Sequence, residues 1–147
     1  MAKAKPVVKA AALDKKITAS TDSLTKACGD VVIAVTAKTA ENKKLTAEIK
    51  RHTKKKAVLT KRRKATAAKL KKIANTENKK SMAAVTKEMK SVQSALDKAR
   101  ASKSAVSTEL AALKAASKRL TAYTKAISAI DKVLNKPVKK KRAKKKV

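Results

Sequence analysis

Residues 82–110, MAAVTKEMKSVQSALDKARASKSAVSTEL, carry the pattern that decides the fold. Alternating steps of three and four residues from Met82 to Leu134 meet apolar side chains at 12 of 16 positions, which is a heptad seam. The same stepping from Ile17 to Ile73 meets apolar side chains at 10 of 17 positions, a weaker seam in constant phase. The two seams predict two long helices that pack against each other.

Between the seams lie Asn75, Thr76, Glu77 and Asn78, residue types that favour turns and helix caps. We therefore expect an all-α fold, a long antiparallel helical hairpin (coiled coil) with basic disordered N- and C-terminal tails. The predicted parts are a flexible basic tail at residues 1–12, a hairpin at 13–135 and a basic tail at 136–147. Within the hairpin we expect arms at about 13–74 and 79–135 and a turn at 75–78.

Folding about this turn brings residues whose numbers add up to about 155 opposite each other. Leu59 then faces Leu96, and Lys38 faces Ser117. Three alternatives remain open at this point. A dimer of single long helices would use the same heptads, Gly29 followed by Asp30 would split the first arm, and the chain would stay disordered until it meets DNA.

The charge of the chain predicts its partner. The 147 residues contain 41 Lys and Arg against 10 Asp and Glu, a formal net charge of +31. So large a charge repels itself in a compact monomer and is attracted to any polyanion. An anionic membrane is the weaker alternative because the chain has no Trp or Phe, the residues that usually anchor interfacial helices. Nucleic acid is therefore the expected partner.

Two basic clusters are the candidate nucleic-acid-binding residues. Residues 50–72 contain no acidic side chain, which is unusual for a merely solvated helical face, and the C-terminal tail is almost entirely basic. The predicted contacts are Lys50, Arg51, Lys54, Lys55, Lys56, Lys61, Arg62, Arg63, Lys64, Lys69, Lys71 and Lys72 in the first cluster, and Lys139, Lys140, Lys141, Arg142, Lys144, Lys145 and Lys146 in the second.

Binding to the backbone of duplex DNA without sequence preference is the default expectation. Lys outnumbers Arg, and a Lys ammonium suits phosphate better than it reads bases. Tyr123 alone cannot form the stacking surface of a single-strand binder. His52 and Cys28 are single residues of their kind and the acids are scattered, so we expect no enzyme, no metal site and no cofactor.

The segments KRRKATAAKLKKIA (residues 61–74) and KPVKKKRAKKKV (residues 136–147) resemble bacterial linker-histone-like nucleoid proteins of the Lys/Ala-rich, chlamydial histone-like type. In that family a Lys-rich helical hairpin precedes a Lys/Ala basic tail. The resemblance implies non-specific DNA compaction. The tail here differs in lacking repeated Lys-Ala-Ala-Lys or Pro-Ala-Ala-Lys units.

The sequence thus predicts a histone-like nucleoid protein that binds, bridges and compacts double-stranded DNA through Lys and Arg contacts to phosphates. The alternatives are a structural coiled-coil component of a virion or another nucleic-acid-containing assembly, and an RNA-backbone binder such as a ribosome-associated protein. We expect an intracellular location in the bacterial nucleoid or cytoplasm. Nucleus or virion is the alternative, because Pro137 and the basic run after it resemble a nuclear localisation signal. A homo-oligomer through the heptad seam is a further expectation.

Overall fold

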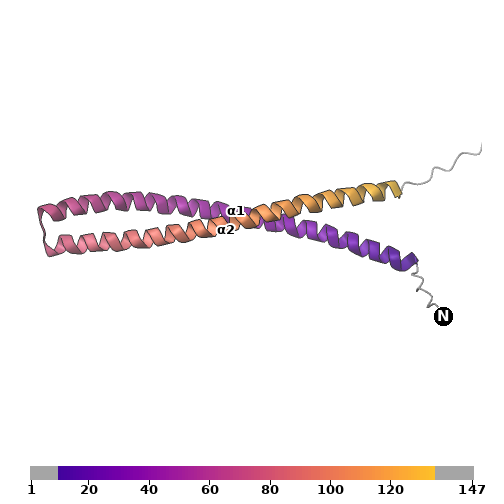
Figure 1. The fold of residues 1–147 in the computed structure, drawn as a ribbon, viewed down its shortest axis with the longest axis horizontal. Helices are drawn as coiled ribbons and strands as arrows, with labels where there is room; N and C mark the ends of the chain where they lie inside the picture. The colour runs from indigo at the N-terminus through magenta and orange to yellow at the C-terminus, as the bar shows by residue number, and fades with distance from the viewer. Residues whose placement is uncertain (1–9, 135–147) are drawn as a thin grey trace, which may run out of the picture. The chain divides into compact units, whose positions relative to one another are not determined.

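The computed structural model describes residues 10–134, which form two helices joined by a short turn (Figure 1). Helix α1 spans Ala10–Lys72 and helix α2 spans Thr76–Leu134. The two pack against each other as a hairpin, and the described part of the chain contains no strand. The predicted all-α helical hairpin is confirmed. The tail predicted at 136–147 and residues 1–9 of the tail predicted at 1–12 lie outside the described residues.

The chain divides into two compact units. One unit is Ala34–Leu113, which contains the turn and is called the turn unit below. The other combines Met1–Ile33 with Lys114–Val147, and we call it the terminal unit. Residues 10–33 and 114–134 are its described part.

The turn consists of residues 73–75, and Asn75 closes it as the N-cap of α2. The backbone N–H of Asn78 donates to Oδ1 of Asn75 at 2.8 Å, and Nδ2 of Asn78 donates to the carbonyl oxygen of Ile73, also at 2.8 Å. These bonds satisfy polar groups that a helix end leaves unpaired. The turn-forming residues after Asn75 therefore form the first turn of α2, with the carboxylate of Glu77 near the positive end of the helix dipole.

Helix α1 runs without a break through Gly29 and Asp30. Gly29 does not have a positive φ, and a Cβ added to it would meet nothing within 4 Å. The split of the first arm that this pair suggested does not occur, because neither residue leaves the helical conformation.

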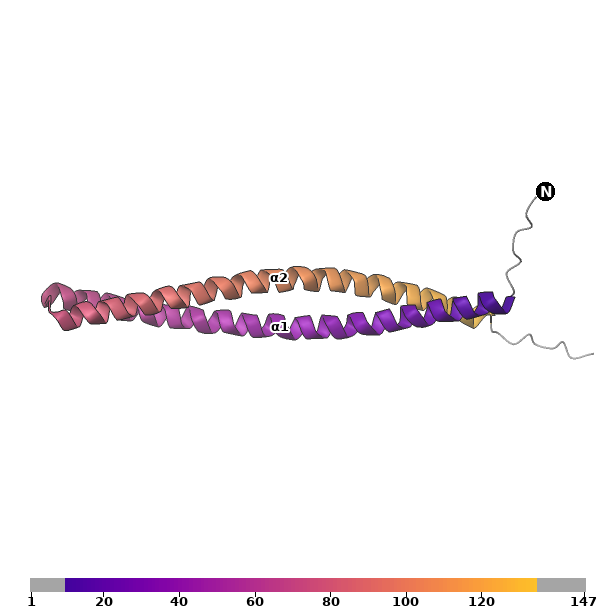
Figure 2. The same cartoon turned by 90° about the horizontal axis from the view of Figure 1, so that it is seen from below.

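The core of the turn unit is one row of side chains between α1 and α2, which lie side by side there (Figure 2). Leu96 is 2% exposed and Val85 is 1% exposed. The other buried side chains are Leu59, Val92, Ala99, Val106, Leu110 and Thr66. All six buried residues of α2 are positions of the predicted second seam. Helix α1 contributes only Leu59 and Thr66, in agreement with its weaker seam.

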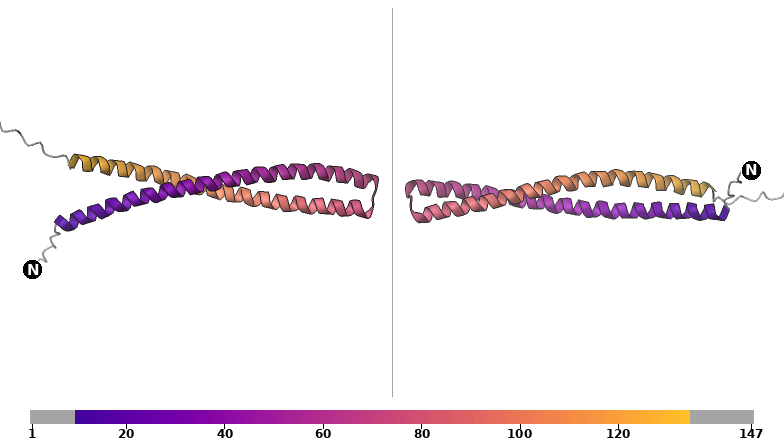
Figure 3. Two further views of the ribbon diagram at one scale, coloured as in Figure 1. Left: turned by 180° about the vertical axis from the view of Figure 1, so that it is seen from behind. Right: turned by 60° about the horizontal axis from the view of Figure 1, so that its bottom comes forward.

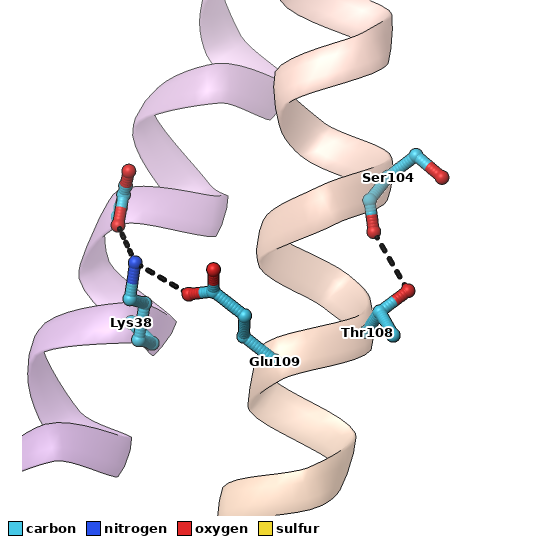
Figure 4. Close-up of polar contacts among 5 residues, drawn as sticks. Lys38, Ser104, Thr108 and Glu109 are labelled. Carbon is cyan, nitrogen blue, oxygen red and sulfur yellow. Dashed lines mark hydrogen bonds and ion pairs between the residues drawn. The ribbon is translucent and has the colours of Figure 1, made fainter.

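The register differs from the sequence prediction by about one heptad. Nζ of Lys38 lies 2.7 Å from Oε2 of Glu109, about two helical turns before the expected partner Ser117 (Figure 4). Nζ of Lys55 lies 3.2 Å from Oε1 of Glu88, on the same side of this displacement. The predicted pairing of Leu59 with Leu96 shifts accordingly. A shift of seven residues keeps every seam position on the seam, so the heptad pattern alone does not distinguish the two registers.

The terminal unit is less tightly packed. None of its described side chains is buried, although both helical segments continue the heptad seams. In the left view of Figure 3 the two segments of this unit draw apart toward residues 10 and 134. Its seam side chains, such as Leu24 and Ile127, remain half-buried.

Truncating Leu96 to Ala removes one of the two most deeply buried large side chains of the turn unit. We expect Leu96→Ala to reduce the free energy of unfolding by about 2–3 kcal/mol, because the row of side chains around it can close the cavity only in part. Thermal and urea unfolding followed by circular dichroism measure this. The matched control is Val58→Ala on α1, whose side chain is 64% exposed, and an equal loss in both variants would contradict a core at Leu96.

Replacing Gly29 by Ala tests the continuity of α1. Because the helix is regular at this position and the added methyl group meets no atom, we expect Gly29→Ala to stabilise the helix by about 0.5–1 kcal/mol. The helical circular dichroism signal should then persist to a higher temperature. A destabilised variant would show that the chain leaves the helical conformation at this residue.

Candidate nucleic-acid interface

The first predicted basic cluster lies on α1 within the turn unit and faces solvent. Eleven of its twelve side chains are exposed, and Lys56 is half-buried. The exposed members are Lys50, Arg51, Lys54, Lys55, Lys61, Arg62, Arg63, Lys64, Lys69, Lys71 and Lys72. Arg63 occupies a seam position yet stays exposed, as a long side chain can when its charged end reaches water. We call these twelve residues the α1 basic surface.

Heptad spacing arranges this surface asymmetrically around α1. Lys55, Arg62 and Lys69 are seven residues apart and share one flank of the seam, while the remaining exposed members cover the outer face. The other flank carries Thr53 and Thr60, whose hydroxyl groups donate to the carbonyl oxygens four residues earlier. One flank and the outer face of the helix are therefore basic, whereas the second flank is neutral.

Few of these charges are neutralised by carboxylates. Lys55 pairs with Glu88, and an Nη atom of Arg51 lies 3.9 Å from Oε1 of Glu48. Within residues 10–134 the other ten members of the α1 basic surface make no ion pair. Exposed like charges this close together repel one another in the free protein. The arrangement leaves their ammonium and guanidinium groups available to an external polyanion.

Lys38 has a different role, because it links the two helices of the turn unit. Its Nζ lies 3.1 Å from Oε2 of Glu41 on α1 as well as 2.7 Å from Oε2 of Glu109 on α2 (Figure 4). The hydrogen bond to Glu109, followed by that to Glu41, raises the pKa of Lys38 above its ordinary value. Lys38 is thus committed to an internal ion-pair network.

Four exposed lysines of α2 join the same unit and were absent from the predicted site. They are Lys79, Lys80, Lys87 and Lys90. Three of them, Lys79, Lys87 and Lys90, line a shallow hollow with Leu70 of α1 and Met82, Ala83 and Thr86 of α2. The sequence analysis limited the site to runs without acids, and these lysines alternate with Glu77 and Glu88. Their charge was visible in the sequence, but their approach to α1 follows from the hairpin.

The remaining candidate residues show no catalytic arrangement. His52 is half-buried on the seam, with Nε2 3.5 Å from Oε1 of Glu48 and Nδ1 without a hydrogen-bond partner. Cys28 is a half-buried free cysteine. Over the residues that the structure describes, no three His, Cys, Asp or Glu side chains gather where they could hold a metal ion. The second predicted cluster, Lys139 to Lys146 in the tail, lies outside those residues.

Neither helix contains, in its described residues, an apolar stretch that could cross a membrane. No family model, curated protein or solved structure matches the chain.

The ion pair of Lys38 predicts a pH-dependent stability. The folded state raises the pKa of Lys38 above its unfolded value of about 10.4, so the pair contributes fully below that pH and is lost as the pH rises through the folded-state pKa. Glu109→Gln should therefore melt at a lower temperature than the wild type near neutral pH, and the difference should shrink in strong alkali. A double-mutant cycle with Lys38→Met isolates the pair. A difference that stays constant through alkaline pH would refute this origin.

Proposed function

We propose that the turn unit binds double-stranded DNA through its phosphates, without reading sequence. The observation that carries the proposal is the α1 basic surface, with ten exposed or half-buried Lys and Arg side chains that make no ion pair within the described residues. Such groups release condensed counterions when they meet phosphates, which supplies binding free energy independent of base sequence.

The charge of the whole unit supports this function. Residues 34–113 contain 22 Lys and Arg against 6 Asp and Glu. A monomeric helical hairpin gains no stability from so large an excess of one sign, because the charges repel one another across and along the helices. A polyanion that binds the folded unit relieves this repulsion and stabilises the fold.

The length of the surface suits a duplex. At about 1.5 Å per residue, residues 50–72 of α1 extend over about 33 Å, close to the length of one turn of B-DNA, about 34–36 Å. A straight helix lined with flexible Lys side chains can follow phosphates on successive turns of either strand. The α2 lysines around Leu70 add positive charge near the end of this surface.

The side chains present favour phosphate contacts over base recognition. Most of the α1 basic surface is Lys, a mobile point charge, and its Arg residues are Arg51, Arg62 and Arg63. The turn unit has no aromatic side chain on which an unpaired base could stack. These features support a nucleoid-type role, in keeping with the resemblance to linker-histone-like proteins. Compaction and bridging belong to the same proposal and require more than one DNA-binding surface on a particle.

Neutralising part of the α1 basic surface should reduce the salt dependence of DNA binding. For the triple variant Lys61→Gln, Lys64→Gln and Lys71→Gln we expect the slope of log affinity against log salt to fall by about 2–3, roughly 0.9 for each phosphate that the variant no longer neutralises. Fluorescence anisotropy with duplexes of equal length and unrelated sequence measures the slope, and the affinities should agree between sequences.

The matched control removes three exposed lysines of the same unit outside the surface, by Lys43→Gln, Lys44→Gln and Lys98→Gln. Both triple variants remove the same net charge, so a localised interface requires a smaller change of slope in the control. Equal slopes in the two variants would sink the assignment to α1. A duplex RNA of equal length that binds more tightly than DNA would move the proposal to the RNA-backbone alternative.

A further inference from the structure

The terminal unit exposes large apolar side chains that its own two helical segments leave uncovered. Ile17 is 62% exposed and Leu134 is 75% exposed, and Leu13, Tyr123, Ile130 and Val133 are also at least 48% exposed. No side chain in residues 10–33 and 114–134 is buried, whereas the turn unit has a continuous buried row. Two helical segments that bury so little gain little stability from packing. The unit therefore gains from a further surface that covers it.

These side chains gather on one flank of the seam. Leu13, Ser20 and Ala27 recur every seven residues on α1, and Tyr123 and Ile130 do so on α2. This heptad position is uncharged throughout the described terminal unit. In the turn unit the same position carries Lys55, Arg62 and Lys69 on α1 and Glu88 and Glu109 on α2. The flank thus changes from charged in one unit to apolar in the other.

The flank is hollowed at two places that share Ser20. One hollow is lined by Lys16, Ile17, Ser20 and Thr21 of α1 and Ile127, Ile130, Asp131 and Leu134 of α2. The second is lined by Ala19, Ser20, Ser23, Leu24 and Ala27 of α1. Small side chains beside large exposed ones suit the interdigitation that packed helices need. We call this surface, from Leu13 and Ile17 to Ala27 and from Tyr123 to Leu134, the apolar flank.

We propose that the apolar flank binds the apolar flank of a second copy of this chain, which forms a two-fold symmetric dimer. Charge complementarity points to this occupant. The α1 segment 10–33 holds three Asp and three Lys, whereas the α2 segment 114–134 holds five Lys and Arg and one Asp. In an isologous interface each segment meets the other segment of the partner, so the acidic side chains Asp14, Asp22 and Asp30 approach basic ones.

Other occupants fit the surface less well. The chain's own basic tail, residues 136–147, offers only Val138, Val147, Ala143 and Pro137 as apolar side chains, too few to cover the flank. DNA phosphates do not cover apolar groups. Pairing through the turn unit would bring two strongly positive surfaces together, whereas the terminal unit is the less charged of the two. A second copy supplies both the apolar and the charged complement.

A dimer of this kind carries two α1 basic surfaces on one particle. If the proposed function holds, such a particle is bivalent for duplex DNA, and its second binding event is intramolecular. The dimer would then supply the second DNA-binding surface that bridging requires. This consequence rests on the proposed function, but the dimer itself does not.

The test is the mass of the full chain in solution without DNA, measured by sedimentation equilibrium in high salt, which screens the repulsion between the turn units. We expect the wild type to be a dimer at micromolar to submillimolar concentration, and Ile17→Lys combined with Ile130→Lys to weaken self-association at least about tenfold. The matched control is Val58→Lys combined with Ile73→Lys, which charges two comparably exposed side chains of the turn unit, 64% and 62% exposed. The control should remain dimeric.

Amide hydrogen exchange of the unmodified chain separates loss of the interface from loss of folding. Protection of residues 10–33 and 114–134 should rise with protein concentration, while that of the turn unit stays constant. A wild type that is monomeric at every concentration, a control that dissociates as readily as Ile17→Lys/Ile130→Lys, or protection independent of concentration would each overturn the proposal. A DNA-free dimer that fails to bind duplex DNA would leave the dimer standing and remove the proposed function instead.

Discussion

Burial of one row of apolar side chains between α1 and α2 is the interaction on which the turn unit depends. Leu59, Val85, Val92, Leu96 and Leu110 are almost completely shielded from water, while most of the other side chains around them are polar or charged. The hydrophobic effect acts here against the repulsion of a strongly positive surface. Because the row is only one side chain deep, its continuity matters more than its total area. A single gap lets water and charge repulsion act on the whole local segment.

The sequence determined the fold class because heptad spacing survives any sliding of one helix along the other. Val85, Val92, Ala99 and Val106 recur every seven residues, and all four are buried. The register could not be read from the same pattern, since a slip of one heptad exchanges equivalent positions. What selects the register is local to the turn. Asn75 accepts a hydrogen bond from the N–H of Asn78 and so starts α2 at Thr76, earlier than a turn at 75–78 would allow. The pairing of Lys38 with Glu109 follows from that start.

The candidate site could be predicted as a list of residues but not as a surface. Absence of acids from residues 50–72 correctly indicated exposed side chains, because a charged group is rarely buried unless it is paired. Which charges are free depends on the partner helix. Lys55 is neutralised by Glu88, which lies far away in sequence, and the α2 lysines near Leu70 join the unit through the hairpin. These relations require the register, which the sequence pattern left ambiguous by a heptad.

The distribution of charge and apolar surface separates two tasks within one pair of helices. The turn unit combines a buried row with uncompensated Lys and Arg, a combination that discourages association between copies and attracts polyanions. The terminal unit has the opposite balance, with exposed Ile17, Ile130 and Leu134 and an uncharged flank. Had the apolar side chains lain on the turn unit, self-association would have covered the basic surface and opposed its own electrostatics. Their position in the terminal unit lets association and polyanion binding occur together, so each can strengthen the other when both copies bind one polyanion.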